Sequence, residues 1–301
     1  MAVRKLNDSY GIQGRLSFKE DAHGLIVASL ESEEAYCELY LYGAHVSRLF
    51  FKEGEDLLWM SPTALFQPPK AIRGGVPVCW PWFGPAENKR LPQHGFARNS
   101  LWHVQSATLL EDAGVELTLE LPERQAHDAL WPYHFELRYL IRLFKDRLEL
   151  RLQTSNRDSK AFSFNAALHS YFAVSDIEKT EILGLDQSRF IDQTDAHVLK
   201  RQHGSVRCEK ETDRIYLETS HPCIIKDNAT KRSIVVDKEG SDATVVWNPW
   251  QDKAKAMLDF EDEGYRKMIC VESLIHDQAI MLAPGSTYEL IQKISFREEL
   301  L

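Results

Sequence analysis

Apolar and polar side chains alternate along several stretches of the chain. Between Phe135 and Leu143 every second residue is apolar, and the same alternation returns between Leu148 and Leu152. An alternation of period two is typical of a β-strand that buries one face and exposes the other. The residues between the two runs, 145–147, are Lys, Asp and Arg, so this region predicts two strands joined by a hairpin turn.

Shorter segments repeat this pattern, whereas helical patterns are rare. Further strands are predicted at residues 115–121, 162–172, 244–247, 268–273 and 288–296. A second hairpin is predicted over residues 233–247 with its turn near 238–241, and short helices are predicted near 122–131 and 257–263. Many strands and few helices predict an all-β fold, a large antiparallel β-sandwich. Residues 1–301 contain no linker, low-complexity segment or clean repeat, so we expect a single domain.

The composition narrows the class of partner. A formal net charge of −9 over 301 residues argues against general binding to nucleic acid or to an anionic membrane, since both favour basic surfaces. The five cysteines are scattered and form no CxxC pair, which disfavours a disulfide framework and a thiolate metal site. No segment resembles a signal peptide or a membrane span, so we expect a cytoplasmic protein. No assembly element is evident, so we expect a monomer.

The segment RGGVPVCWPWFGP, residues 73–85, combines chain-breaking residues with large aromatic ones. Proline and glycine favour a loop, and the aromatic side chains would anchor that loop to the core. Gly74 and Gly75 would let a ligand approach the backbone beside Arg73. A second segment, 91–100, supplies Gln93, His94 and Arg98. Two arginines on converging loops would form an anion site; alternatively, they are unrelated surface residues.

His169 lies in the predicted strand 162–172. In an extended strand Asn165, Ala167, His169 and Tyr171 share one face, and the apolar residues Phe164, Ala166, Leu168 and Phe172 share the other. The first face would form the floor of a polar cleft, where an imidazole can exchange protons near neutral pH. The alternative is a half-buried histidine that only forms structural hydrogen bonds.

Three further segments contain candidate functional residues. Glu272 ends an apolar strand, where desolvation would raise its pKa toward the range of a general base; alternatively, it has reached solvent. Asp213 could orient sugar hydroxyls, or it could be a turn residue paired with Arg214. Trp247 and Trp250 could stack on a sugar ring, or they could belong to the core. His197 and His203 lack a matching ligand set, so we expect no metal.

Taken together and in order, these segments resemble one family, the hexose-6-phosphate mutarotases (glucose-6-phosphate 1-epimerases) of the aldose 1-epimerase superfamily. The NGR and ANR motifs expected of the galactose mutarotase branch are absent from the sequence. The matching segments span most of the chain: RGGVPVCWPWFGP (73–85), QHGFARN (93–99), NAALHSYF (165–172), TDRIY (212–216), VVWNPW (245–250) and CVES (270–273).

The resemblance implies a galactose-mutarotase-like β-sandwich that interconverts the α and β anomers of hexose 6-phosphates without a metal or organic cofactor. It implies that His169 is the general acid and Glu272 the general base. It also implies that Arg73, Gln93, Arg98 and Asp213 bind the substrate, with the two arginines on the phosphate. Whether His94 or Trp247 contacts the substrate stays open. The alternatives are a non-catalytic carbohydrate-binding sandwich and a mutarotase for another aldose.

Overall fold

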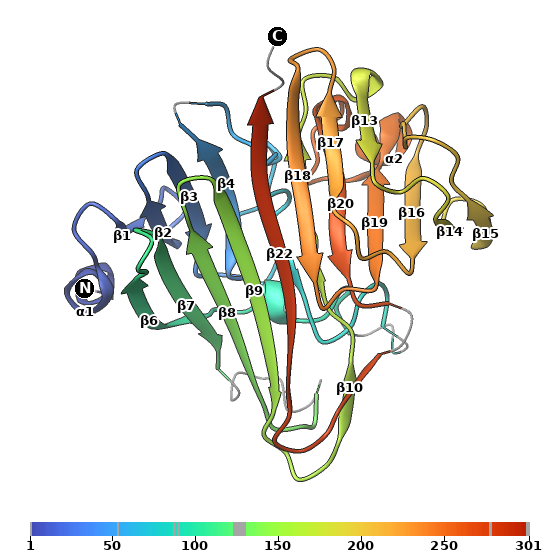
Figure 1. The fold of residues 1–301 in the computed structure, drawn as a ribbon. Helices are drawn as coiled ribbons and strands as arrows, with labels where there is room; N and C mark the ends of the chain where they lie inside the picture. Colours follow the sequence, from blue (N-terminus) through green and yellow to red (C-terminus); the bar gives the residue numbers. More distant parts are fainter. Residues whose placement is uncertain are drawn as a thin grey trace.

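A computed structural model describes residues 2–52, 54–86, 88, 91–122, 131–276 and 279–298. The described chain consists mainly of antiparallel sheets, which confirms the predicted all-β sandwich (Figure 1). Within these ranges no helix is long and apolar enough to cross a membrane. All five cysteines are buried free thiols.

The largest layer is an eight-stranded sheet in the order β13-β17-β18-β22-β9-β8-β7-β6. In Figure 1 its strands follow one another from β6 on the left to β13 on the right of centre. Its strands are β6 (His103–Leu109), β7 (Val115–Leu121), β8 (Phe135–Leu143), β9 (Arg147–Asn156), β13 (Thr180–Leu183), β17 (Cys223–Asp227), β18 (Arg232–Glu239) and β22 (Thr287–Glu298).

A second eight-stranded sheet has the order β15-β14-β16-β19-β20-β11-β5, with β12 also paired to β20. Most of it lies at the right of Figure 1. Its strands are β5 (Val78–Cys79), β11 (Ala167–Leu168), β12 (Tyr171–Ala173), β14 (Arg189–Asp192), β15 (Val198–Arg201), β16 (Thr212–Leu217), β19 (Ala243–Asn248) and β20 (Met268–Leu274).

The remaining elements complete the sandwich. A four-stranded sheet contains β1 (Leu16–Glu20), β2 (Ile26–Glu31), β3 (Ala35–Tyr40) and β4 (His45–Phe51), and a two-stranded sheet contains β10 (Phe162–Phe164) and β21 (Ile280–Leu282). The helical elements are α1 (Ala2–Tyr10), α2 (Trp250–Ala256) and the short 3₁₀ helices η1 (Ala97–Asn99), η2 (Ile177–Lys179) and η3 (Gly264–Lys267).

The apolar residues that alternate with polar ones along the strands form the core between the sheets. The predicted hairpin of β8 and β9 is confirmed, with Leu143 opposite Leu148 in the register. The apolar face of β8 is buried in the main core, including Leu137, Tyr139 and Ile141 with no exposed surface. Burying each of these side chains stabilises the folded state by roughly 1.5–3 kcal/mol. One buried face is therefore enough to keep the strand packed on the core.

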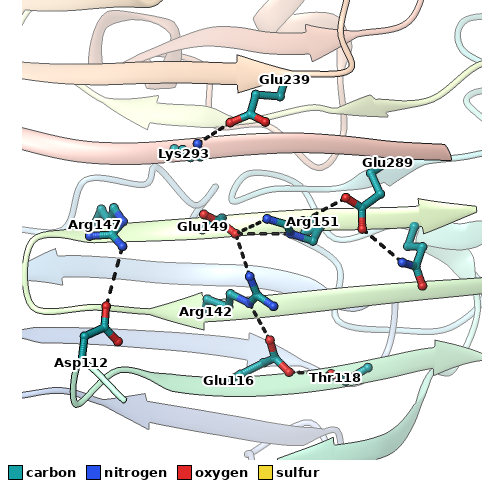
Figure 2. A network of polar contacts seen from close by, with 11 residues as sticks. Asp112, Glu116, Thr118, Arg142, Arg147, Glu149, Arg151, Glu239, Glu289 and Lys293 are labelled. Atoms are coloured by element: carbon teal, nitrogen blue, oxygen red, sulfur yellow. Dashed lines mark hydrogen bonds and ion pairs between the residues drawn. The ribbon is translucent and has the colours of Figure 1, made fainter. Parts of the chain in front are cut away.

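The opposite face of the same sheet carries a network of charged side chains (Figure 2). Glu116, Arg142, Glu149 and Lys293 occupy directly opposed positions on β7, β8, β9 and β22. Arg142 contacts both Glu116 and Glu149, and Arg151 joins Glu149 as well. A slip of one residue would bring these charges inside and the leucines outside, so the alternating pattern specifies the register of the sheet.

The predicted hairpin over residues 233–247 is wrong. Its two halves, β18 and β19, lie in different eight-stranded sheets, and the turn at Gly240 carries the chain from one layer to the other. Gly240 has φ of +65°, and a Cβ there would lie 1.9 Å from the Glu289 carbonyl oxygen. Two alternating runs around a glycine turn fit this change of sheet as well as they fit a hairpin, so periodicity alone could not separate the two.

Two helices were predicted from the sequence, and a third one, α1, was not. Most of the helix predicted near 122–131 lies outside the described residues. The helix predicted at 257–263 is wrong, because α2 ends at Ala256 and turns follow it. The amino-terminal α1 was not predicted; its Asn7 amide bonds the backbone of Phe18 in both directions, which attaches this helix to β1.

Candidate active site

A cavity of about 580 Å³ opens beside the second eight-stranded sheet. β12, β16, β19 and β20 contribute side chains to it, as do the loops around residues 73–85 and 93–98. The other lining residues are Asn165, His169, Gln193, Lys253, Met257, Ile275 and His276. The six site residues predicted from the sequence all line this cavity, although they are spread over 200 positions of the chain: Arg73, Gln93, Arg98, His169, Asp213 and Glu272.

The loop that carries Arg73 is held by its aromatic side chains, as predicted. Trp80 is fully buried, and its ring packs 4.6 Å from that of Phe135. The role predicted for the two glycines is wrong. A Cβ on Gly74 would lie 2.4 Å from the Trp59 carbonyl oxygen, and one on Gly75 would lie 2.2 Å from the Val46 carbonyl oxygen. The space they leave is therefore filled by the protein's own backbone.

His169 lies at an interruption between two very short strands. β11 pairs with β20 through Leu168 and Ser273, and β12 pairs with the same strand through Tyr171 and Cys270, so His169 is held beside Glu272. The His169 Nδ1 atom lies 3.3 Å from Glu272 Oε1. The predicted division of faces is confirmed except at Ala167, even though the strand is broken. Asn165, His169 and Tyr171 line the cavity, whereas Ala167 is buried in a core cluster. The residues predicted on the other face all lie in the main core: Phe164, Ala166, Leu168 and Phe172.

Burial controls the protonation of this pair. His169 is 8% exposed and Glu272 is 1% exposed, so the alternative in which Glu272 has reached solvent is wrong. Burial raises the pKa of the Glu272 carboxyl well above its usual range, and the charge of Asp213 adds to the rise. Burial lowers the pKa of His169 well below its usual range, with His94 and Arg98 adding to the fall. Both shifts favour a neutral carboxyl beside a neutral imidazole over an ion pair.

His94 is a second neutral imidazole at the cavity. Its Nδ1 accepts a hydrogen bond of 3.2 Å from the backbone N–H of Gly84, and its ring lies 5.7 Å from the His169 ring. Burial first, and then Arg98, lower the pKa of His94 to about 3. Because Nδ1 is an acceptor, the ring proton resides on Nε2, so His94 is a hydrogen-bond donor at this cavity.

Asp213 and Trp247 form another part of the wall. Asp213 lies 3.9 Å from Lys253 Nζ, whereas Arg214 donates to Gln202 and Tyr216; the pairing of Asp213 with Arg214 considered above is therefore not formed. Trp247 lines the cavity while packing in the core. Trp250 instead packs on Tyr265, with ring centroids 5.2 Å apart.

The two arginines differ in their partners. The Arg73 guanidinium contacts Asp259 through Nε and Nη2, at 3.2 and 3.3 Å, and donates from Nη1 to the Tyr171 hydroxyl at 3.0 Å. Arg98 donates from Nη2 to the Gln93 carbonyl oxygen at 3.0 Å and forms no ion pair with any described carboxylate. Its buried Nε has no hydrogen-bond partner among the described residues, so Arg98 retains donors for a ligand.

Comparisons with known proteins identify the family of this chain. Residues 27–295 match the family described as aldose 1-epimerase. The chain belongs to this family. It is 39% identical over 259 residues to a protein of Cenchrus ciliaris named "Putative glucose-6-phosphate 1-epimerase", covering 83% of this chain and 78% of that one. An Escherichia coli K12 protein of the same name is 37% identical over 278 residues, covering 92% and 91%. As an aldose 1-epimerase family member, the chain is an epimerase that acts on a small-molecule sugar.

Solved structures of the family give the same result for the fold. A Salmonella typhimurium protein described as a "putative mutarotase" superposes with a TM-score of 0.89 at 30% identity, over 99% of this chain and all of that chain. Two other solved structures are 16% and 12% identical, with TM-scores of 0.72 and 0.69, and these show the fold alone. The galactose mutarotase-like sandwich expected from the sequence is therefore confirmed.

Several residues of this aldose 1-epimerase cavity were not predicted from the sequence. Gln193, Lys253 and His276 line it, and Asp259 holds Arg73 from outside it. They come from turns and a short helix, where no periodicity indicates which way a side chain points. Tyr171 was indicated only by its place on the same strand face as His169.

Proposed function

We propose that the protein interconverts the α and β anomers of hexose 6-phosphates, chiefly glucose 6-phosphate. The observation that carries this proposal is the buried contact between His169 and Glu272 in a cavity that also contains Arg73 and Arg98. An acid–base pair serves ring opening at an acetal carbon, and paired arginines suit a phosphate group. The names of the relatives from Cenchrus ciliaris and Escherichia coli support the same substrate.

Anomer exchange requires one proton to leave the C1 hydroxyl and one to reach the ring oxygen. Glu272 would accept the hydroxyl proton while His169 donates a proton from Nε2 to the ring oxygen. Oε2 of Glu272 would take the hydroxyl proton as Oε1 gives up the carboxyl proton to His169 Nδ1, so the pair ends with the proton count it began with. Oε1 and Nδ1 lie 3.3 Å apart and form no hydrogen bond in this structure, so this transfer requires the two side chains to align when the substrate binds. The C1–O5 bond breaks, the aldehyde rotates about C1–C2, and closure on the other face reverses each transfer.

This relay fits the electrostatics of the site. Because burial disfavours the charge on both groups, a path that passes one proton through the pair avoids a separated imidazolium and carboxylate. Glu272 Oε2 has no hydrogen-bond partner among the described residues, so it is available to the substrate hydroxyl. Each transfer typically contributes about 10²–10⁴-fold to the rate.

The arginines would act on binding rather than on bond breaking. The phosphate is remote from C1, so Arg73 and Arg98 would supply binding energy and orientation. Gln93 and Asp213 would hold sugar hydroxyls, since both line the same cavity as the arginines and the acid–base pair.

The direct test uses a pure anomer of glucose 6-phosphate. Its approach to equilibrium is followed by exchange NMR, with buffer alone as the reference and with glucose as a second substrate. The proposal predicts acceleration, with a larger kcat/KM for glucose 6-phosphate than for glucose. Equal values for the two sugars would favour a mutarotase of unphosphorylated aldoses, and no acceleration of either would leave a carbohydrate-binding sandwich. The cytoplasmic location, monomeric state and single domain expected from the sequence stay predictions.

A further inference from the structure

A smaller hollow of about 240 Å³ adjoins the main cavity. The two share Arg73, Gln93, Arg98 and Tyr171. The hollow adds Lys70 and Asp259, which the main cavity lacks.

The charges at the two ends of this combined space differ. Lys70, Arg73, Arg98 and Asp259 leave the hollow with a formal net charge of +2. Lys70 and Arg98 form no ion pair with any described residue, and Asp259 compensates Arg73 at 3.2 Å. Lys253, which lines the main cavity but not the hollow, is compensated by Glu211 at 2.8 Å. The uncompensated positive charge is therefore concentrated in the hollow, and it matches a phosphate monoester, which carries about −1.5 to −2 at neutral pH.

The donors of Arg73 can be counted. A guanidinium has five N–H groups; Asp259 takes two and the Tyr171 hydroxyl takes one. Two N–H groups remain, which is the number that a bidentate contact with phosphate needs. The ion pair with Asp259 thus leaves Arg73 competent to bind an anion and restricts the orientation of its remaining donors.

Asp259 is itself held in place. Its neighbour Phe260 is 3% exposed and packs on Trp59, with ring centroids 4.7 Å apart. Trp59 donates its backbone N–H to the Tyr171 carbonyl oxygen at 2.9 Å. Both partners of Arg73 therefore belong to one packed cluster, so the guanidinium is fixed before any ligand arrives.

We propose that Lys70 is a third ligand of the substrate phosphate and that Asp259, although acidic, is a positioning residue that strengthens phosphate binding by fixing Arg73. This inference rests on the proposed function. The direction in which removal of Asp259 changes phosphate affinity separates the two possible roles. If Asp259 only added negative charge, its removal would strengthen phosphate binding. If Asp259 fixes the donors of Arg73, its removal weakens phosphate binding.

The experiment measures kcat and KM for glucose 6-phosphate and glucose in wild type, Lys70→Ala and Asp259→Ala. Matched controls are Lys145→Ala, an exposed lysine without an ion pair to any described residue, and Asp112→Ala, whose partner Arg147 lies 3.9 Å away on the outer face. We expect both test variants to raise KM for glucose 6-phosphate about tenfold, with a much smaller change in kcat. The preference for glucose 6-phosphate over glucose should fall by a similar factor. Lys70→Arg should restore most of the binding, and Asp259→Asn should give an intermediate KM, because it keeps one oxygen acceptor.

An unchanged or lower KM in Asp259→Ala overturns the positioning role, and a Lys70→Ala variant that behaves like Lys145→Ala overturns the role of Lys70. Failure of the proposed function is recognised separately, because wild type would then accelerate neither sugar. In that case titration with inorganic phosphate tests the hollow by itself. Weaker phosphate binding by both variants than by wild type supports the inference, and equal binding contradicts it.

Discussion

His45 gives the sharpest stability prediction, because it is buried directly beneath the loop that carries Arg73. It begins β4, is 2% exposed, and has an Nε2 atom without a hydrogen-bond partner among the described residues. A Cβ on Gly75 would lie 2.7 Å from that atom. Burial first, and then the charge of Arg98, lower the pKa of His45 from 6.5 to about 3. Protonation would place an uncompensated cation beside Arg98.

The magnitude follows from proton linkage. A histidine whose pKa is lower in the folded state stabilises the fold above its unfolded pKa, and this contribution is lost as the pH falls toward the folded pKa. For a pKa of about 3 in the folded state and 6.5 in the unfolded state, lowering the pH from about 7 to about 5 costs about 2 kcal/mol.

The assay is urea denaturation of wild type and His45→Gln at both pH values. The substitution itself changes the unfolding free energy by an amount that does not depend on pH. The informative quantity is therefore how the difference in unfolding free energy between the two proteins changes with pH. That difference should shift by about 2 kcal/mol in favour of the variant on going to about pH 5. Other buried histidines, such as His94, are present in both proteins and cancel. A difference that does not change with pH would refute the assignment of His45 as a buried neutral imidazole.

Three other variants test separate parts of the structure. Glu272→Gln should lower the rate about 10²–10⁴-fold. It should not lower the unfolding free energy at neutral pH, because folding must take up a proton at the buried Glu272 carboxyl and an amide avoids that cost. Since the pKa of Glu272 is raised in the folded state, wild type should lose stability as the pH rises above the unfolded pKa, and urea curves of the variant should lack this loss. Gly95→Ala places a Cβ 1.9 Å from the Trp80 carbonyl oxygen at φ of +75°, and thermal melts should show a loss of about 3 kcal/mol or more. Its control, Gly14→Ala, has φ of +68° with nothing within 4 Å and should lose only about 1 kcal/mol; equal losses would show that the contact is not the cause. Lys238→Met removes the ammonium that donates to Thr219, Ala243 and Thr244, and the unfolding free energy should fall by about 1–3 kcal/mol. Because burial lowers the pKa of Lys238 to about 8, wild type should gain stability relative to the variant as the pH rises above 8. A difference in unfolding free energy that stays constant with pH would contradict this.

The sequence predicted the strands well where one face is buried and the other is solvated. Phe135 to Leu152 is the best example, because the leucines and the charged ladder of β8 and β9 assign opposite faces. The face carrying His169 was predicted for the same reason, although the strand breaks beside it. The alternation of apolar and polar residues determines which side of a strand faces the core. Which strand becomes its neighbour depends on contacts across the whole fold. This is why β18 and β19 were joined in a hairpin that does not exist.

The site was predicted through motifs rather than through periodicity. Arg73, Arg98 and Glu272 were named because their segments resemble a family, and the cavity brings them together. Asp259 could not be predicted, because it lies in a turn between α2 and η3 and its role depends on the position of Arg73, which is 186 residues away in the chain. The role of Gly74 and Gly75 was misjudged for a similar reason: what fills the space of a missing side chain is decided by distant backbone.

The central claim is that the contact between His169 and Glu272 performs the proton transfers of anomer exchange. It is tested most directly by the rate at which saturating glucose 6-phosphate exchanges between anomers in magnetisation-transfer NMR with wild type and with His169→Asn. We predict that wild type exceeds the buffer rate and that the variant loses about 10²–10⁴-fold of kcat while KM changes far less. A His169→Asn protein that retains the wild-type rate would contradict the account.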